Sequence, residues 1–313
     1  MKEIKIEKHK NNIVAKSNEL IKAKGSLSGT AQKMLASVIS MLKTDDTEFQ
    51  QYALKIDDYL ELIGSKSNNK NFLMEQAKEL MRNPFEVDRK LFNWCSMVDL
   101  GKIEGYIVFD IHQELKPYLL QLKERGNFTQ YKIINILSLR GEYSPRLYEY
   151  FVMEFNQQRK YQKVCVLTLK IDDLRSFLQI PKSYRYNHIK TRIIEKAERD
   201  FKDHTDIKFT YIEKKIGRKV DQLIITITEN NRDKNNYLSS QQAFISYIRK
   251  NFVNKKLLEG IDKDTKKKII ISVAPDGKIY DLYQNTNFNA TKSLKMWELL
   301  HTRAKEGKLD LNI

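Results

Sequence analysis

Apolar and polar positions alternate along this chain with two periods, and the order of these periods indicates a fold. Between residues 28 and 43, apolar side chains recur every three or four positions, which is the spacing of one helix face. A short strand pattern, a short helix and a longer helix that ends before Pro84 come next. Stretches that alternate with period two then flank the polar segment 99–105. Three helices followed by a hairpin is the element order of a winged-helix domain.

The same order of elements returns in the second half of the chain. The five residues Leu54–Asp58 recur unchanged as Leu169–Asp173, and a short helix follows each copy. A polar turn, a longer helix and an alternating hairpin come after that helix in both places. An identity of five residues has little weight alone, but the shared order of elements predicts a duplicated domain.

Two such copies imply an α+β fold with two tandem winged-helix domains, each a helix-turn-helix with a β-hairpin wing. We expect residues 1–125 to form the N-terminal domain and residues 126–230 the C-terminal one. The Asn-rich stretch near 230–240 is typical of a linker. Residues 237–313 then form a small C-terminal α/β extension, with a hairpin signal at Pro275–Gly277. The pattern assigns no role to this extension.

Charge and cysteine content narrow the class of protein. The formal net charge is +16, which attracts polyanions such as nucleic acid, although a solubilising lysine-rich surface is the plain alternative. No apolar stretch approaches the roughly 18 residues of a membrane span, and the charged residues 1–10 do not resemble a secretory signal. Cys95 and Cys165 lie in separate apolar stretches, which is typical of buried thiols in a reducing compartment. We therefore expect a cytoplasmic protein with no membrane partner.

The long helix expected over residues 187–202 has the strongest pattern for contact with duplex DNA. Its core stripe includes Ile193, Ala197 and Phe201, and cations lie across the helix from that stripe. A helix of this kind fits the major groove, where its N-terminal part reads bases. The alternative interpretation is a solvated helix face. The candidate base readers are Arg185, His188 and Arg192, and Lys196 and Arg199 are the candidates for contact nearer the phosphates.

The hairpin that follows this helix has a cationic tip. Lys214, Lys215, Arg218 and Lys219 surround Gly217, which suits a turn that needs positive φ. These four cations repel one another unless an anion lies between them, and a phosphate backbone supplies that anion. We expect this wing to add affinity and salt dependence but little sequence choice.

The first copy is less basic at the same place. Its long helix presents Glu75 and Glu79 beside its cations, which weakens the case for base reading. The first domain is therefore expected to contact DNA weakly, or to serve partly as a protein interface. Its candidate phosphate contacts are Lys66, Lys70, Lys78 and Arg82.

Patterns for enzymatic chemistry are missing from the sequence. The five histidines are far apart, so the His-x-His metal pair of a nicking initiator is not present. No Gly-rich loop ends in Gly-Lys-Ser or Gly-Lys-Thr, as a helicase or loader ATPase requires. The pairs Asp57-Asp58 and Asp172-Asp173 suit capping and the dipole of a helix start better than a metal site. We expect no catalytic residues, no metal and no cofactor.

Three motifs give the chain a resemblance to a known family. Over roughly residues 15–228, and in the segments Phe128–Tyr131, Tyr143–Glu149 and Tyr211–Arg218, it resembles the Rep_3 family of theta-type plasmid replication initiators. That resemblance implies binding to direct repeats, called iterons, at a plasmid origin, and opening of an adjacent AT-rich segment. It also implies recruitment of a host initiator and helicase. Self-association through the first domain, with dimers that repress their own gene, is a further implication.

The resemblance also bears on individual residues, and it leaves alternatives open. It implies that the second domain is the main reader, with Arg185, His188 and Arg192 on bases and the wing cations on the backbone. Arg146 belongs to the second motif, where it either binds DNA or supports packing. The alternative functions are a winged-helix transcriptional repressor without initiator activity, and a nicking initiator or primase.

Overall fold

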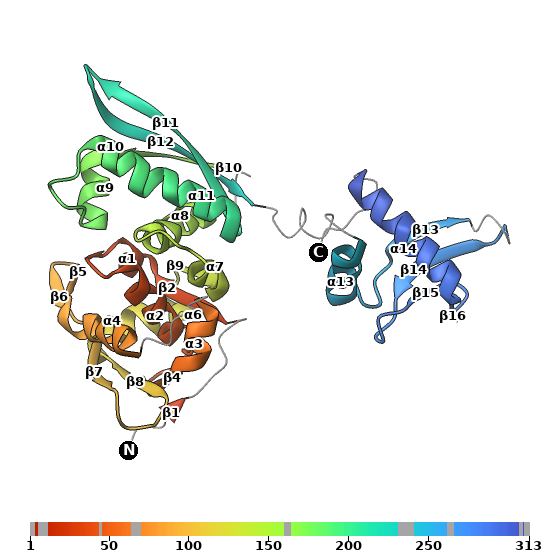
Figure 1. Cartoon of the computed structure of the whole chain (residues 1–313), viewed down its shortest axis with the longest axis horizontal. Coiled ribbons are helices and arrows are strands. Elements are labelled where there is room, and N and C mark those ends of the chain that lie inside the picture. The colour runs from red at the N-terminus through yellow and green to blue at the C-terminus, as the bar shows by residue number, and fades with distance from the viewer. Residues whose placement is uncertain are drawn as a thin grey trace. The chain divides into compact units, whose positions relative to one another are not determined.

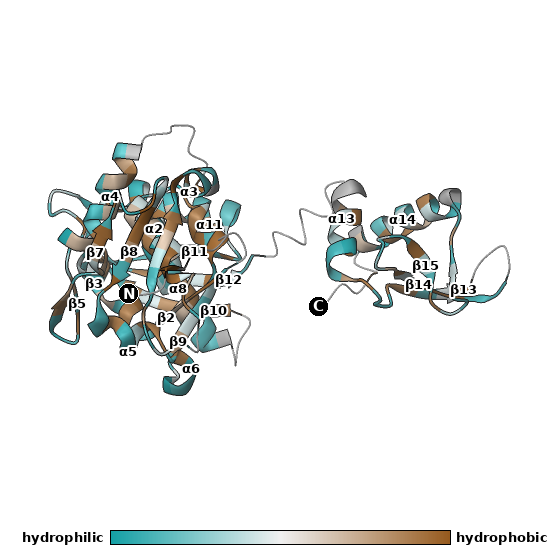
Figure 2. Ribbon diagram, turned by 90° about the horizontal axis from the view of Figure 1, so that it is seen from below, coloured by the Kyte–Doolittle hydropathy of each residue, from teal (hydrophilic) through white to brown (hydrophobic). Residues whose placement is uncertain are grey.

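The structure is a computed structural model that describes residues 4–5, 12–43, 46–63, 70–159, 164–230, 241–261, 266–306 and 309. The chain forms two units, Met1–Asn230 and Asn231–Ile313 (Figure 1). Both predicted winged-helix domains lie in the first unit, and one hydrophobic core runs through both of them. Figure 2 shows apolar positions gathered in the interior of this unit.

The first winged-helix domain has the predicted order of helices and strands. Helix α2 begins at Ser28, whose hydroxyl accepts a hydrogen bond from the Ala31 amide at 3.2 Å. Apart from β2, its strands form two sheets, with the orders β1-β4-β8-β7 and β3-β5-β6. The elements are β1 (Ile4–Lys5), β2 (Ile13–Ser17), α1 (Asn18–Lys22), β3 (Lys24–Gly25), α2 (Gly29–Ile39), β4 (Gln51–Lys55), α3 (Ile56–Leu62), α4 (Lys70–Arg82), β5 (Phe85–Val87), β6 (Lys90–Phe92), β7 (Cys95–Asp99) and β8 (Tyr106–Ile111).

The second winged-helix domain contains one three-stranded antiparallel sheet, with the order β10-β12-β11. Helices lead into this sheet as they do in the first copy. The elements from residue 113 onward are η1 (Gln113–Leu115), α5 (Lys116–Leu119), α6 (Leu122–Arg125), β9 (Phe128–Lys132), α7 (Ile133–Leu137), α8 (Ser144–Arg159), β10 (Val164–Lys170), α9 (Ile171–Leu178), α10 (Tyr186–Ile189), the π-helix η2 (Lys190–Ile194), α11 (Glu195–His204), β11 (Ile207–Ile216) and β12 (Lys219–Glu229).

The segment between the two copies differs from its sequence pattern in two places. Residues 114–123 have a helical pattern, but Gln121 has φ 53°, and this left-handed backbone separates α5 from α6. The pattern from Tyr131 onward is also helical, but 128–132 form strand β9, which pairs antiparallel with β2. Pairing with a strand more than a hundred residues away overrides the local helical pattern there.

The duplicated five-residue segment occupies the same place in both copies. In each, it spans the end of a strand (β4 or β10) and the start of the next helix (α3 or α9). The two N-cap residues, Lys55 and Lys170, make no side-chain capping bond, and the aspartates lie in the first helical turn. The aspartates therefore stabilise the helix through its dipole rather than as caps.

An aromatic cluster joins the elements of the second domain. Phe201 of α11 packs edge-on against Phe151 of α8 and Phe209 of β11, with ring centroids 5.9 and 5.2 Å away. All three side chains are buried. The helix that leads into the wing is therefore fixed to both the domain core and the wing strand.

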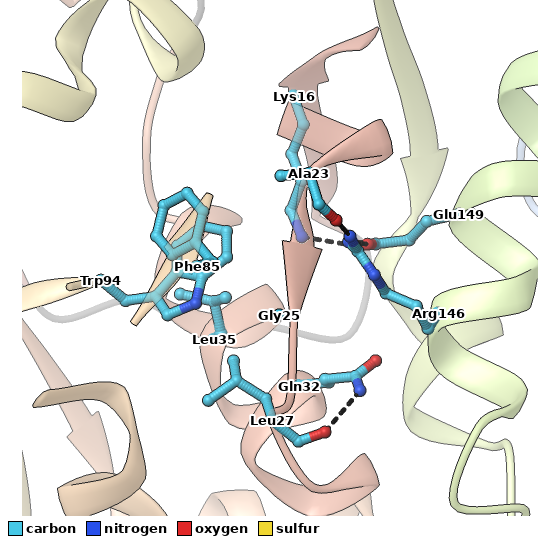
Figure 3. A pocket seen from close by; sticks show the side chains of 10 residues that line it. All are labelled: Lys16, Ala23, Gly25, Leu27, Gln32, Leu35, Phe85, Trp94, Arg146 and Glu149. Atoms are coloured by element: carbon cyan, nitrogen blue, oxygen red, sulfur yellow. Dashed lines mark hydrogen bonds and ion pairs between the residues drawn. The ribbon is translucent and has the colours of Figure 1, made fainter. Parts of the chain in front are cut away.

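A buried charge cluster joins helix α8 to strand β2 and to the end of α1 (Figure 3). Lys16 of β2 lies 2.5 Å from the Glu149 carboxylate of α8, and the side chains are only 4% and 5% exposed. Arg146, also on α8, lies 3.7 Å from the same carboxylate and donates to the Ala23 carbonyl. Arg146 is therefore a packing residue, which decides the alternative that its sequence motif left open.

The second unit has a core of its own. Its described strands form an antiparallel meander in the order β13-β14-β15-β16, and the described helices α13 and α14 bury Phe244, Ile248 and Trp297 against the sheet. The elements are α13 (Gln241–Asn251), β13 (Leu258–Ile261), β14 (Lys268–Val273), β15 (Ile279–Asp281), β16 (Thr286–Asn287) and α14 (Ala290–Lys305). The linker expected near 230–240 lies, apart from Asn230, outside the described residues.

Two further expectations concern cysteines and membranes. Cys95 and Cys165 are buried free thiols, and burial raises the pKa of the Cys165 thiol to about 11. Within the described part of the chain, none of the helices combines the length and apolar character that crossing a bilayer requires.

Candidate nucleic-acid interface

Hydrogen bonds fix the backbone of the turn between α9 and α10. Helix α9 ends at Gln179, whose left-handed φ of 53° reverses the chain. Arg175 of α9 then donates to the Tyr184 carbonyl at 2.5 Å, and the Tyr184 amide bonds to the Pro181 carbonyl. These bonds fix the backbone at Tyr184, immediately before the predicted base readers.

The predicted long helix is interrupted by a π-helical segment. Helix α10 passes into η2 at Lys190 and continues as α11 from Glu195. A π-turn contains more residues than an α-turn, so the side chains that follow it are displaced around the axis. A wheel drawn for a regular α-helix therefore does not describe the whole segment. We call residues 185–204 the recognition segment.

The three candidate base readers lie together at the start of the recognition segment. Arg185 and Arg192 are exposed, and His188 is half-buried. The Tyr184 ring joins two of them: its centroid is 5.5 Å from the His188 ring and 5.6 Å from the Arg192 guanidinium. The Arg185 amide donates to His188 Nδ1 at 3.2 Å, which fixes the imidazole against the helix start.

The two candidate phosphate contacts further along have different surroundings. Arg199 is exposed. Lys196 is half-buried and lies 3.8 Å from the carboxylate of Asp200, a buried residue. Asp200 in turn accepts hydrogen bonds from the Arg140 and Gly141 amides, at 3.0 and 2.6 Å. Lys196 therefore lies beside the 140–141 turn, where its charge is partly balanced, and its contact with DNA stays a prediction.

The wing presents its cations as the pattern predicts. Gly217 has φ 60° at the tip between β11 and β12, and a β-bulge lies between Lys214 and Lys215. Figure 1 shows the hairpin extending past α10, so that its tip projects from the unit. The wing side chains Lys214, Lys215, Arg218 and Lys219 are all exposed.

An ion pair joins the recognition segment to the wing. Lys190 Nζ of η2 lies 2.8 Å from the Glu213 carboxylate of β11. Their hydrogen bond raises the pKa of Lys190 and lowers the pKa of Glu213. Sequence reasoning missed this pair, because 23 residues separate the partners and each is an ordinary charged residue. The pair places the recognition segment and the wing on one connected surface.

The first domain places its cations differently. Lys78 and Arg82 of α4 both approach Glu75, at 2.5 and 3.6 Å, so one carboxylate partly neutralises two candidate phosphate contacts. Lys66 lies outside the described residues, and Lys70 is placed only as the first residue of α4. Lys78 and Arg82 therefore stand on a less cationic surface than the tip of the second wing.

The described residues were also considered as possible metal ligands and as the lining of pockets. In the parts of the chain with described side chains, no group of three or more His, Cys, Asp or Glu is arranged to hold a metal ion. The pocket beside the buried charge cluster has a volume of about 20 Å³, which admits a water-sized molecule.

Known protein families match both halves of the first unit. Residues 13–152 match the family model described as Initiator Replication protein, WH1, and residues 170–227 match Initiator Rep protein, WH2. The chain belongs to this family of replication initiators. The matched residues include the cluster around Glu149, the recognition segment and most of the second wing, and they end before the second unit.

Individual relatives agree with this membership. A replication initiation protein from Escherichia coli is 23% identical over 247 residues, which cover 72% of this chain and 75% of the relative. A crystal structure of the Pi initiator protein in complex with iteron DNA resembles this chain's structure, with a TM-score of 0.56 and 17% sequence identity. That match covers 71% of this chain and 98% of the other, and it shows a shared fold.

Proposed function

We propose that this initiator binds iteron repeats at a plasmid origin, with its second winged-helix domain as the main reader of sequence. The observation that carries the proposal is the single cationic surface formed by the recognition segment and the wing, joined by Lys190 and Glu213. The solved initiator of the same fold is a complex with iteron DNA, which supports the same ligand for this chain.

The surface divides the work between its two parts. Arg185, His188 and Arg192 enter the major groove and contact base edges. The wing cations approach the phosphate backbone on the flank of the site and fix the register of the protein. The first domain, with Lys78 and Arg82 tied to Glu75, contributes weaker backbone contacts or a protein interface.

Initiation itself requires steps beyond binding. By family resemblance, the bound protein opens an adjacent AT-rich segment and recruits a host initiator and helicase. The same resemblance supports self-association, with a dimer that represses its own gene. The proposal includes no catalytic step, no metal and no cofactor.

Two measurements test the proposal against its alternatives. Footprinting on the DNA around the gene should protect tandem repeats spaced by about two helical turns, roughly 21 base pairs. The protein, supplied in trans, should maintain a plasmid that carries only those repeats and the adjacent AT-rich segment. Protection of an operator without plasmid maintenance would make the protein a repressor.

Incubation with supercoiled origin DNA separates initiation by binding from initiation by cleavage. We expect the DNA to remain supercoiled, with no covalent protein–DNA adduct after denaturation. Nicked circles or a tyrosine-linked adduct would replace the proposal with a nicking initiator.

A further inference from the structure

One aromatic ring organises two of the candidate base readers. His188 meets the Tyr184 ring edge-on, with an interplanar angle of 67°, and Arg192 lies over the same ring. Tyr184 itself is half-buried, and its backbone is fixed by Arg175 and Pro181. Both side chains are therefore restrained by the same ring, whose backbone is fixed.

The hydrogen bond to His188 determines which of its ring nitrogens can meet DNA. Nδ1 accepts the Arg185 amide proton at 3.2 Å, so Nδ1 carries no proton in this arrangement. A neutral imidazole then carries its proton on Nε2. The nitrogen that remains for a ligand is therefore a hydrogen-bond donor.

Arg192 adds donors of the same kind. Its guanidinium has five N–H groups in a fixed fork and no acceptor. Among the described side chains, no carboxylate forms an ion pair with it, and it is exposed. Contact with the Tyr184 ring restrains the fork without using its hydrogen-bonding groups.

Base edges in the major groove differ in how many acceptors they present. Guanine offers two acceptors, N7 and O6, whereas adenine offers the N7 acceptor beside an N6 donor. A pair of side chains that only donates is satisfied by guanine, but adenine presents it with a donor. Complementary hydrogen bonding therefore favours guanine opposite this pair.

We propose that Tyr184 is a positioning residue that holds His188 and Arg192 as a donor-only pair, and that this pair selects a guanine in each repeat. The inference rests on the proposed function, because it requires the recognition segment to read duplex DNA. It goes further by assigning a base to two named side chains and a role to a third.

The test uses synthetic repeats in which one guanine at a time is altered. In 7-deazaguanine the N7 acceptor is absent, whereas inosine keeps both N7 and O6 and is the matched control. For the full-length protein, we expect 7-deazaguanine at one position to weaken binding about 5- to 100-fold. Inosine at that position should change affinity by less than about twofold, since its major-groove edge is unchanged.

Protein variants then connect that guanine to Tyr184. Tyr184→Ala should reduce the 7-deazaguanine effect to less than about twofold, while affinity for unrelated duplex stays within about twofold of the parent. Tyr184→Phe keeps the ring and should retain the full effect. Arg192→Lys keeps the charge and a donor but loses the planar fork held over the ring, so it should weaken the guanine preference and retain the salt dependence.

Failures of the two proposals look different. A protein that binds all duplexes equally would overturn the proposed function itself. A protein that prefers its repeats would overturn only the inference if no guanine responds to 7-deazaguanine, or if Tyr184→Phe abolishes the response as Tyr184→Ala does. Affinity for unrelated duplex reports folding, so a variant that has merely unfolded is recognised by loss of all binding.

Discussion

At the scale of single residues, Glu149 is a buried carboxylate whose charge must be balanced inside the protein. It is the partner of two buried cations, Lys16 and Arg146, and it also accepts a hydrogen bond from the Tyr131 hydroxyl. Removing one partner from a buried ion pair is far more costly than removing a surface charge, because the other charge stays buried without compensation. The contact between β2 and α8 therefore depends strongly on this one carboxylate.

Replacing Glu149 tests that conclusion. Glu149→Gln keeps the shape but leaves Lys16 and Arg146 without their countercharge, and we expect a loss of about 3–5 kcal/mol in the free energy of unfolding. Urea unfolding measures the difference. The control Glu124→Gln, on the exposed end of α6, should change stability by less than about 0.5 kcal/mol. Equal effects of the two variants would contradict the buried pairing.

The same carboxylate predicts how stability responds to acid. Burial alone would raise the pKa of Glu149, but Lys16, Arg146 and the hydrogen bonds outweigh it and lower that pKa below its ordinary 4.5. A lowered pKa stabilises the fold above pH 4.5, and this stabilisation is lost as pH falls from there through the folded-state pKa. Unfolding curves should therefore show a steeper acid decline for the parent than for Glu149→Gln. Parallel acid declines would contradict the lowered pKa.

The structural roles of single residues could be predicted from the sequence only where the local pattern decides them. The positive φ of Gly217 was predicted, because a turn of this kind needs only its immediate neighbours. The role of Arg146 was not, since the Ala23 carbonyl to which it donates lies more than a hundred residues away. The segment Tyr143–Glu149, which supports the family resemblance, proves to consist mostly of buried packing residues rather than DNA contacts.

At the scale of elements, the recognition segment and the wing have different tasks. The segment is tied to the core through Phe201 and Asp200, which favours precise placement of its side chains. The wing tip is exposed and cationic, which favours contact with a uniform backbone. Sequence choice should therefore depend on the segment, and salt dependence on the wing.

Salt titrations separate these two tasks. Replacing both Lys214 and Lys215 by Ala removes two candidate phosphate contacts. The slope of log K against log salt should fall in magnitude by about 0.9 for each phosphate that is no longer neutralised, while the preference for the repeat is kept. The control Lys208→Ala lies about 20 Å back along the same strand and should leave the slope unchanged. An unchanged slope in the tip variant would remove the wing from the interface.

The elements were predicted well where one period dominates, and less well where tertiary contacts decide. Helix α4 and the β11–β12 hairpin follow their patterns closely. The sequence pattern did not predict the π-helix η2, because Ile193 and Ile194 give an apolar stripe that suits either helix type. The pattern did not predict strand β9 either, since its pairing with β2 is a long-range contact.

At the scale of the whole molecule, the two units are built as separate bodies. Each has its own core, one ending at Ile227 and the other beginning at Phe244. The linker pattern predicts that the extension starts at 237, and the chain divides into its two units at Asn231. The sequence pattern did not predict that the two winged-helix domains share one core, because it indicated only two copies of the same order of elements.

Two tryptophans make the independence of the units measurable. Trp94 lies in the first unit and Trp297 in the second, and both are buried. We expect Trp297→Phe and Trp94→Phe, each with one remaining reporter, to give different guanidinium midpoints by fluorescence. A chain ending at residue 230 should reproduce the Trp94 midpoint, because that unit keeps its whole core. One common midpoint that disappears on truncation would show that the units unfold together.

The core that both winged-helix domains share also limits the DNA this protein can accept. If the first domain contacts the backbone while the second reads bases, two domains that share one core cannot adjust their separation, so the protein sets the length of duplex between their contacts. An extra base pair there would turn one half of the site by about 34–36° relative to the other, since a full turn takes 10–10.5 base pairs. Repeats with altered spacing between the two halves should then be rejected even when every contacted base is correct.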